Sequence, residues 1–347
     1  MKKKIVFPKP FAQGDTIAVT APSSGVPAEL HPLLHRSRKH MERLGFNVVE
    51  GETIWTQNKC VSAPHETRAR ELMQYLLDPN IQAIIPPWGG EFLMDILPLL
   101  DWEQLKEAPP KWVFGYSDIS TFLFAYTLRT GVATAHGPNY VDVSSSDPLD
   151  PVTTRWLDVL GNSHTVEQVS STHYQSAWNH EIPGFHLDTL STWKFLGENK
   201  MAAADEKISF AGRLIGGCMD TISILIGTPY APVQTFIQDY CSQTGVIWYL
   251  ESCEMNAADI YRHLWQMKQC GWFEHAAGIL IGRPAGYSPT QDFELTDALT
   301  AALGDLNIPV LYDVDIGHMP PQLTLINGAL ATVTYQDGQG QVVMTFE

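Results

Sequence analysis

Strand-like and helix-like segments alternate along the first 140 residues of the chain. Short apolar runs rich in β-branched residues predict buried strands, and between them lie longer segments with apolar residues at helical intervals. The expected strands are 15–21, 47–50, 81–85 and 112–115, and the expected helices are 30–44, 64–77, 92–100 and 120–129. Since adjacent parallel strands need a crossover, this alternation predicts a parallel sheet with helices on both faces.

The pattern changes after this first part. Residues 141–206 are rich in Ser, Thr, Asn, His and Asp but also in aromatic residues, which indicates a connecting region with short irregular elements. From residue 207 onward, strand and helix patterns return and end in a hairpin around Asp337-Gly338. We therefore expect a two-domain α/β protein. A flavodoxin- or Rossmann-like domain spans 1–140, a connecting region 141–206 and a mixed α/β domain 207–347.

Composition and charge narrow the class of protein. The chain has 347 residues, of which 44% are hydrophobic and 17% are charged, so a large core is possible. Its 22 basic and 38 acidic residues give a formal charge of −16, which argues against nucleic acid or anionic lipid as a partner. No run of 18 apolar residues predicts a membrane span, and the first residues lack the apolar core of a signal peptide. We expect a cytoplasmic globular protein.

The cysteines give no metal or disulfide framework. Their number is odd, they lie far apart, and no two are spaced as Cys-x-x-Cys. A zinc ribbon and a set of disulfides are therefore not expected.

Ser117 is the candidate nucleophile. It follows an apolar strand in the segment Gly115-Tyr116-Ser117-Asp118, and a helix is expected to begin two or three residues later. A serine in such a turn presents its hydroxyl above the sheet edge, where helix N–H groups can stabilise an oxyanion. The simpler alternative is that Ser117 or Asp118 caps the helix. Ile119 occupies the position of the second glycine in the Gly-x-Ser-x-Gly motif of α/β-hydrolases.

A serine nucleophile needs a base and an acid that orients the base. His318 lies in a stiff turn before two prolines, and His136, in Ala-His-Gly-Pro, is its rival. Glu251 ends an apolar strand, where a carboxylate needs a partner. That partner is either a histidine base or Arg262, unless Glu251 caps the next helix.

In their order along the chain, these segments resemble the serine LD-carboxypeptidase family, which includes muramoyl-tetrapeptide carboxypeptidases and microcin C self-immunity proteins. The resemblance covers nearly the whole chain. The segments that carry it are Gly14-Asp15, Ala21-Pro22-Ser23, Trp88-Gly89-Gly90-Glu91, Gly115 to Ser120, His136-Gly137-Pro138, Gly212 to Gly217, Leu250-Glu251, Tyr261-Arg262, Gly282-Arg283 and Gly317-His318.

The resemblance implies a mechanism and an active site in the cleft between the domains, with the nucleophile on the first domain and the Glu and His on the second. Ser117 would be the nucleophile, His318 the general base and Glu251 the group that orients His318. The backbone N–H of Asp118, with one from the turn Gly89-Gly90, would form the oxyanion hole. The resemblance also implies a homodimer that needs no metal and no cofactor.

Substrate recognition is less specific in the sequence. The stretch 86–91 lacks the Arg-Gly-Gly-Tyr-Gly form of murein enzymes and is closer to the microcin-immunity branch. Glu91, which follows the two glycines, is a candidate for substrate binding. Trp178 or Trp193 in the connecting region is a candidate for stacking on a planar group such as adenine. A cation is expected at the substrate's terminal carboxylate. The candidates are Arg213, which belongs to the segment Gly212 to Gly217, Arg262 and Arg283.

The expected activity is hydrolysis of an amide next to a terminal D-amino acid, as in murein tetrapeptides. The substrate is then a small peptide, or a peptidyl- or aminoacyl-nucleotide if the chain follows the immunity branch. Three other classes stay open at this point. They are an α/β-hydrolase-type esterase, a glutaminase-like amidotransferase with Cys253 as nucleophile, and a non-catalytic two-domain ligand-binding protein.

Overall fold

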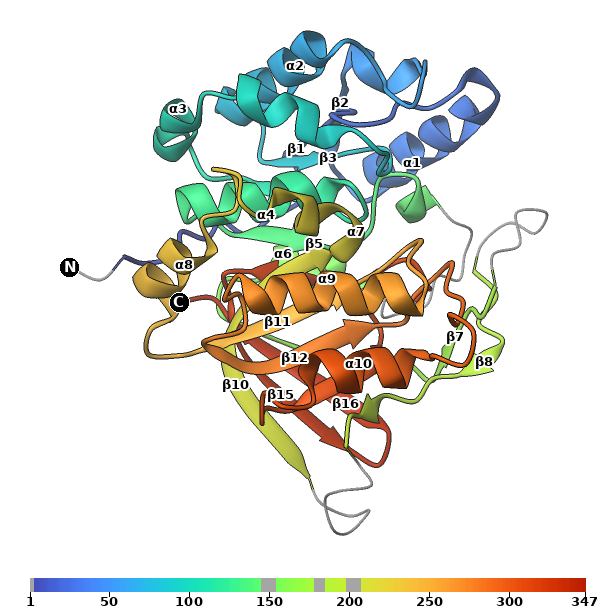
Figure 1. Cartoon of the computed structure of the whole chain (residues 1–347). Helices are drawn as coiled ribbons and strands as arrows, with labels where there is room; N and C mark the ends of the chain where they lie inside the picture. Colours follow the sequence, from blue (N-terminus) through green and yellow to red (C-terminus); the bar gives the residue numbers. More distant parts are fainter. Residues whose placement is uncertain (1–2, 145–153, 178–184, 198–206) are drawn as a thin grey trace.

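The computed structural model describes residues 3–144, 154–177, 185–197 and 207–347, and it consists of two stacked lobes (Figure 1). The upper lobe in that view is built mainly from the first 140 residues, and the lower lobe mainly from the last 140. Each lobe is built on one large sheet. The two-domain α/β architecture expected from the sequence is confirmed.

The first sheet has six strands in the order β14-β5-β4-β3-β1-β2. β1 to β5 run parallel, as the alternation of strands and helices predicts, and β14 pairs antiparallel with β5. The bounds are β1 (Thr16–Val19), β2 (Asn47–Glu50), β3 (Ala83–Ile85), β4 (Trp112–Gly115), β5 (Thr134–His136) and β14 (Leu325–Asn327).

Helices cover this sheet on both faces. Three α-helices form close to the expected positions, and α3 forms where none is expected. The segment expected as a helix at 92–100 forms a 3₁₀-helix, η3 (Leu93–Leu99). Pro98 lies inside it, and proline lacks the N–H that an α-helical ladder needs. The α-helices are α1 (His31–Arg43), α2 (His65–Leu77), α3 (Trp102–Glu107) and α4 (Ile119–Thr130), and the other short 3₁₀-helices are η1 (Ala28–Leu30), η2 (Glu52–Trp55) and η4 (Asp142–Ser144).

The second sheet has eight strands in the order β6-β16-β15-β10-β11-β12-β13-β9. β10 to β13 are parallel, and the pairings toward both edges are antiparallel, so the sheet is mixed as expected. The bounds are β6 (Thr165–Val169), β9 (Lys194–Phe195), β10 (Ile208–Cys218), β11 (Val246–Glu251), β12 (Ala276–Gly282), β13 (Val310–Val314), β15 (Leu330–Gln336) and β16 (Gln339–Thr345). A separate two-stranded sheet pairs β7 (His173–Tyr174) with β8 (Thr189–Leu190).

The expected hairpin joins β15 and β16. Asp337 and Gly338 both have positive φ angles, of 51° and 77°. This is the conformation that a two-residue hairpin turn requires and that the Asp-Gly pair favours.

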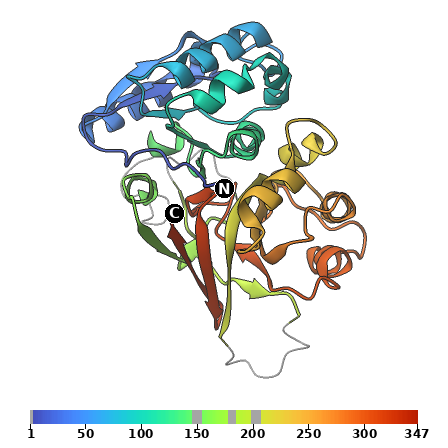
Figure 2. The same cartoon turned by 90° about the vertical axis from the view of Figure 1, so that its left-hand side faces the viewer.

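The longer helices of the second lobe, α9 and α10, lie side by side along one face of its sheet (Figures 1 and 2). The bounds in this half are α6 (Trp156–Leu160), α7 (Met219–Ile222), η5 (Ser223–Leu225), α8 (Val233–Phe236), the π-helical turn η6 (Ile237–Cys241), α9 (Ala257–Gln269) and α10 (Leu295–Leu303).

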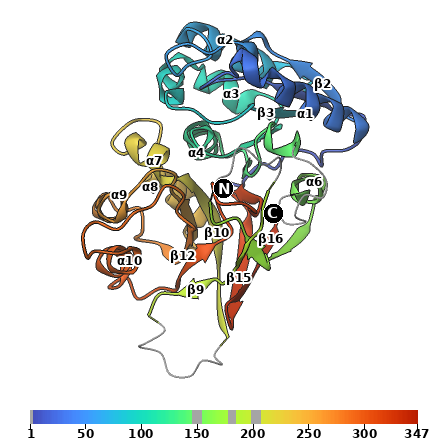
Figure 3. The same ribbon diagram turned by 90° about the vertical axis from the view of Figure 1, so that its right-hand side faces the viewer.

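The chain crosses the expected divisions at two places. β14 comes from the last quarter of the sequence but belongs to the first sheet, and β6 and β9 of the connecting region belong to the second sheet. The two lobes share one continuous hydrophobic core. Helix α4 lies against the second lobe (Figure 3), where a Cβ atom at Gly217 of β10 would lie 2.8 Å from Cβ of Ser120. This close approach brings the strand ends of both sheets together.

No helix in the described part of the chain has the length and hydrophobicity needed to cross a membrane.

Candidate active site

Ser117 lies between the end of β4 and the start of α4, and its backbone is strained. Its φ angle is +66°, and Gly115 two residues earlier has a φ of +150°. A non-glycine residue in the left-handed region is uncommon and is typical of functional turns. The helix has its N-cap at Asp118 and makes no side-chain cap bond. The capping alternative therefore does not explain the turn.

The backbone of Gly89 lies directly against Ser117. A Cβ atom added to Gly89 would lie 2.6 Å from Cβ and from Oγ of Ser117, and 3.1 Å from the backbone N of Asp118. Only glycine fits at this position without a shift of the neighbouring atoms. The Ser117 hydroxyl, the Asp118 N–H and the turn after β3 therefore meet at one point.

The buried side chain of Asp118 fastens these loops together. One carboxylate oxygen accepts hydrogen bonds from the hydroxyl of Ser23 and from the Leu93 N–H (2.9 Å), and the other accepts from the hydroxyl of Thr121 at 3.1 Å. Burial raises the pKa of Asp118, although these hydrogen bonds and Arg68 oppose the shift. The loops after β1 and β3 are thus tied to the start of α4.

His318 and Glu251 form a buried pair across the second lobe. Nδ1 of His318 lies 2.8 Å from Oε2 of Glu251, whose side chain is fully buried at the end of β11. Gly317 allows this approach, because a Cβ atom there would lie 2.4 Å from Oε2 of Glu251.

The electrostatics of this pair favour its charged form. Burial opposes both charges, but His318 and His136 hold the pKa of Glu251 well below its ordinary value. Glu251 in turn raises the pKa of His318 well above 6.5 against the effect of burial. Of the alternatives for Glu251, the structure thus selects a histidine partner, while Arg262 pairs with Asp259 at 2.8 Å.

His136, the rival base, lies on the other oxygen of the same carboxylate. Its Nε2 is 3.7 Å from Oε1 of Glu251, and the ring is almost fully buried at the end of β5. Neither ring nitrogen of His136 has a hydrogen-bond partner within the described part of the chain. Glu251 therefore lies between two histidines. His318 lines the cavity beside Ser117, and His136 does not.

That cavity has a volume of about 340 Å³ and brings the candidate groups together. His318 lines the cavity, and its buried Nε2 has no hydrogen-bond partner in the described residues. Tyr116 places its ring against His318, with 4.9 Å between the ring centroids. The lining consists of Ser24, Gln57, Trp88, Gly89, Gly90, Tyr116, Ser117, Asn139 and His318.

Sequence reasoning did not single out several of these residues. Gln57 comes from a loop with no motif of its own, and it accepts a hydrogen bond from the Gly25 N–H at 2.9 Å. Asn139 directly follows the His-Gly-Pro segment and accepts from the Tyr116 N–H at 3.3 Å. Trp88 precedes the two glycines and donates to the Gly25 carbonyl at 3.1 Å. Trp88 and Asn139 could have been found from the sequence, because each lies beside a recognised motif. Gln57 has no such neighbour in the sequence.

Two residues expected to bind substrate lie elsewhere. Trp193 is fully buried, and its indole N–H donates to Asp315 at 2.9 Å. Arg213 is buried in β10 and donates to the carbonyls of Tyr240 and Gly328. These internal partners occupy both side chains, so the structure does not support their roles as substrate contacts. Trp178 lies outside the described residues.

The other candidate cations are also engaged. Arg283 is buried in an ion pair with Asp315, and Arg262 lies on the exposed face of α9. Neither lines the cavity. Glu91 follows Gly90 at its rim, where partial burial and the carboxylates of Glu254, Asp118 and Asp220 raise the pKa of Glu91.

The thiols of Cys218 and Cys253 both lie near the pair, and Cys253 adds to the rise in the pKa of His318. Cys218 has the spacing of a metal ligand. Its sulfur lies within 4.8 Å of the ligand atoms of Glu251 and His318, a spacing that could hold a metal ion. However, burial, Glu251 and Asp220 raise the pKa of the Cys218 thiol well above its ordinary value, and a protonated thiol is a poor ligand. Cys253, the nucleophile expected if the chain were a glutaminase-like amidotransferase, does not line the cavity.

The sequence and the fold both match known proteins. The LD-carboxypeptidase N-terminal domain matches residues 17–137, and the LD-carboxypeptidase C-terminal domain matches residues 211–333. The chain belongs to this family, the S66 peptidases.

Similar proteins cover nearly the full length. A candidate carboxypeptidase of Vibrio cholerae is 26% identical over 345 residues, which are 96% of each chain. The microcin C7 self-immunity protein MccF of Escherichia coli is 25% identical over 335 residues, 94% of this chain and 93% of that one. The crystal structure of an MccF-like protein from Bacillus anthracis has a TM-score of 0.82 at 23% identity and covers 98% of this chain and 99% of its own.

Proposed function

We propose that the protein is a serine carboxypeptidase that hydrolyses an amide next to a terminal D-amino acid. The observation that carries this proposal is the pair formed by His318 and Glu251, which faces the same cavity as the strained Ser117. Glu251 fixes Nδ1 of His318 and leaves Nε2 toward the cavity. This is the division of roles that a serine nucleophile needs from its base and its acid.

The first step is acylation. Nε2 of His318 takes the proton of the Ser117 hydroxyl as Oγ attacks the carbonyl carbon of the substrate amide. The imidazolium formed is stabilised by the buried carboxylate of Glu251. When the carbon–nitrogen bond breaks, His318 gives the proton to the departing amine, which leaves as the free D-amino acid.

The second step is deacylation. Water gives a proton to Nε2 of His318 and attacks the ester that links the substrate to Ser117. The carbon–oxygen bond to Oγ then breaks, and the proton returns from His318 to the serine. Both steps pass through a tetrahedral intermediate with a negative oxygen.

The Asp118 N–H and an N–H of the Gly89-Gly90 turn are the proposed donors to that oxygen. They are backbone groups beside Ser117, and the Asp118 side chain fastens them in place. Preorganised donors of this type are among the largest contributions to acyl transfer, and the loss of one costs about 2.7–4 kcal/mol.

Peptidyl- or aminoacyl-nucleotides are the second candidate substrates. MccF has been solved in complex with glutamyl sulfamoyl guanosine, and its fold matches this chain with a TM-score of 0.82. A muramoyltetrapeptide carboxypeptidase from Oxalobacter formigenes matches with a TM-score of 0.73. In this chain Trp88 lines the cavity and offers an aromatic face to a base, the role that the sequence gave to Trp193.

The two substrates are best offered in parallel to the purified protein, with product detected by mass spectrometry. Release of D-alanine from a murein tetrapeptide, absent in Ser117→Ala, supports the proposal. Cleavage of an aminoacyl sulfamoyl-adenosine conjugate alone supports the second candidate. In that case Trp88→Leu should raise KM for the conjugate more than it raises KM for a peptide substrate. Turnover by Ser117→Ala at the wild-type rate contradicts the serine mechanism for either substrate.

The homodimer remains a proposal from the family resemblance, and the cytoplasmic location remains a proposal from the composition of the chain. Light scattering on the purified chain is the direct test of the first, because a dimer doubles the measured mass. The monomer mass at micromolar concentration would contradict it.

A further inference from the structure

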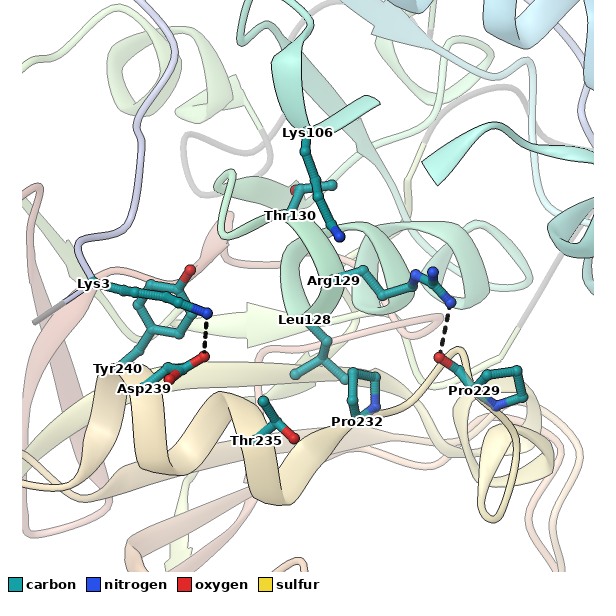
Figure 4. A pocket seen from close by; sticks show the side chains of 10 residues that line it. All are labelled: Lys3, Lys106, Leu128, Arg129, Thr130, Pro229, Pro232, Thr235, Asp239 and Tyr240. Atoms are coloured by element: carbon teal, nitrogen blue, oxygen red, sulfur yellow. Dashed lines mark hydrogen bonds and ion pairs between the residues drawn. The ribbon is translucent and has the colours of Figure 1, made fainter. Parts of the chain in front are cut away.

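A second and larger cavity lies where the two lobes meet, at the end of α4 remote from Ser117 (Figure 4). Its volume is about 600 Å³, and it shares no lining residue with the cavity beside Ser117. The last residues of α4 and Lys106 of α3 contribute from one lobe, and the segment 229–240 contributes from the other. Its size lies within the range of small-molecule sites.

The lining is basic, although the chain as a whole is acidic. Lys3, Lys106 and Arg129 contribute three cations, and Asp239 contributes the one carboxylate of the lining, within a chain that carries a formal charge of −16. A local excess of positive charge in an acidic protein attracts anions to that point of the surface.

Arg129 is held in a fixed orientation without a carboxylate. Its guanidinium lies 4.5 Å from the ring centroid of Trp102 and 5.7 Å from that of Tyr230. Nη1 donates to the carbonyl of Pro229 at 2.9 Å. Within the described residues Arg129 has no ion-pair partner, so its charge is preorganised and not neutralised.

Lys106 has only a weak partner. Its ammonium lies 2.7 Å from Glu103, whose side chain is 80% exposed and belongs to the same helix. Exposed pairs of this kind contribute little free energy, so Lys106 can exchange Glu103 for a better anion. Figure 4 shows Lys106 extending toward the end of α4 that carries Arg129, while Lys3 is joined to Asp239.

We propose that this cavity is a binding site for a small phosphate-bearing anion, held by Lys106 and Arg129. Neither cation pairs with a carboxylate of the lining, and the exposed Glu103 can be displaced from Lys106. Such a pair suits a ligand of charge −2 or more, and Arg binds phosphate oxygens through parallel N–H groups. The ligand would touch both lobes at once, because α3 and α4 face the segment 229–240 across the cavity. The site is independent of the proposed catalytic chemistry.

The test is isothermal titration calorimetry of the full chain with inorganic pyrophosphate at low ionic strength. Saturable one-to-one binding is expected, and Ser117→Ala should bind equally well because the two cavities share no residue. Lys106→Gln and Arg129→Gln should each weaken binding by about ten-fold or more, the usual scale for a charge-assisted contact to phosphate.

Two further variants distinguish binding in this cavity from a general effect of charge. Thr235→Glu adds a carboxylate at an exposed lining position and should abolish binding without removing any contact of the fold. Lys39→Gln removes the same unit of charge from an exposed site on α1 and should leave binding unchanged. Absence of saturable binding by the wild type, or equal affinities for the Lys106, Thr235 and Lys39 variants, overturns the proposal.

Discussion

Gly89 and Ser117 meet so closely that a single added methyl group at Gly89 would overlap the serine hydroxyl. The distance from an added Cβ atom to Oγ is 2.6 Å, well below an ordinary contact. The position of the proposed nucleophile is therefore defined by two loops, the turn after β4 and the turn after β3. A change in either loop moves the reacting oxygen.

Gly89→Ala tests this relationship. The added methyl group displaces Ser117 or the turn, and a shift of this kind lowers the rate about 100-fold. We expect kcat to fall while circular dichroism stays unchanged. Gly227→Ala is the control for a strained substitution outside the cavity lining: its φ of +81° strains an alanine, but the added Cβ atom meets open space and does not touch Ser117. Equal activity of the two variants would show that the turn after β3 does not position Ser117.

The pH dependence of kcat/KM follows from the pair of Glu251 and His318. Because Glu251 raises the pKa of His318 well above 6.5 against the effect of burial, the neutral base forms at higher pH than in an ordinary histidine. Activity should rise with pH through a midpoint above 6.5. Asp142, whose pKa burial raises to about 6, and Tyr116 also face this region, so the midpoint needs a variant to assign it.

Glu251→Gln assigns that midpoint. It removes the charge that raises the pKa of His318 and leaves the burial that lowers it. The midpoint of the residual activity should therefore move to lower pH, together with a loss of kcat. A midpoint that stays where the wild type has it would mean that a group other than His318 titrates.

The same pair contributes to stability over a defined pH range. The lowered pKa of Glu251 gives stability that is lost as pH falls below its ordinary value of 4.5. The raised pKa of His318 gives stability that is present below 6.5 and lost as pH rises through its folded value. The difference in melting temperature between the wild type and His318→Gln should thus be largest between these limits, and a constant difference from pH 4 to 9 would contradict this.

Asp118→Asn should lower stability and activity together. The buried carboxylate accepts bonds from Ser23, Leu93 and Thr121, and an amide places N–H groups against some of these donors. Leaving one buried donor unpaired costs about 1–3 kcal/mol in the free energy of unfolding. Urea unfolding measures this loss in the free energy of unfolding.

Asp101→Asn is the control, because Asn can replace Asp as the N-cap at the start of α3. Equal losses in both variants would contradict the proposed fastening of the loops.

Trp193→Phe separates a structural role from a substrate contact. The indole N–H donates to the fully buried Asp315, so its removal should cost about 1–3 kcal/mol in the free energy of unfolding. KM for either substrate should stay unchanged. Trp265→Phe, on an exposed face of α9, should change neither quantity. A raised KM without a loss of stability in Trp193→Phe would restore its role in substrate binding.

The sequence predicts the local elements well and the long-range pairings less well. Periodicity places α1, α2 and α4 within one or two residues of their bounds, because their apolar faces repeat at 3.6 residues. It does not place β14 in the first sheet, because this pairing joins residues almost 200 positions apart. No local pattern encodes such a contact.

The same limit applies to the site. Ser117, Glu251 and His318 were found because each ends a strand or lies in a stiff turn, and the fold brings such positions together. The indole of Trp193 and the position of Arg213 in the segment Gly212 to Gly217 predict substrate contacts, but the sequence does not show that internal partners occupy both side chains. Gln57 reaches the cavity from a loop, and only the tertiary structure places it there.

The central claim is that Ser117 is an activated nucleophile, and a fluorophosphonate probe tests it most directly. Peptide mapping by mass spectrometry should find the adduct on Ser117. Labelling should be much slower in His318→Gln and in heat-denatured protein, because both lack the positioned base. An unlabelled Ser117, or an adduct on another residue, would contradict the account and leave a binding protein as the better description.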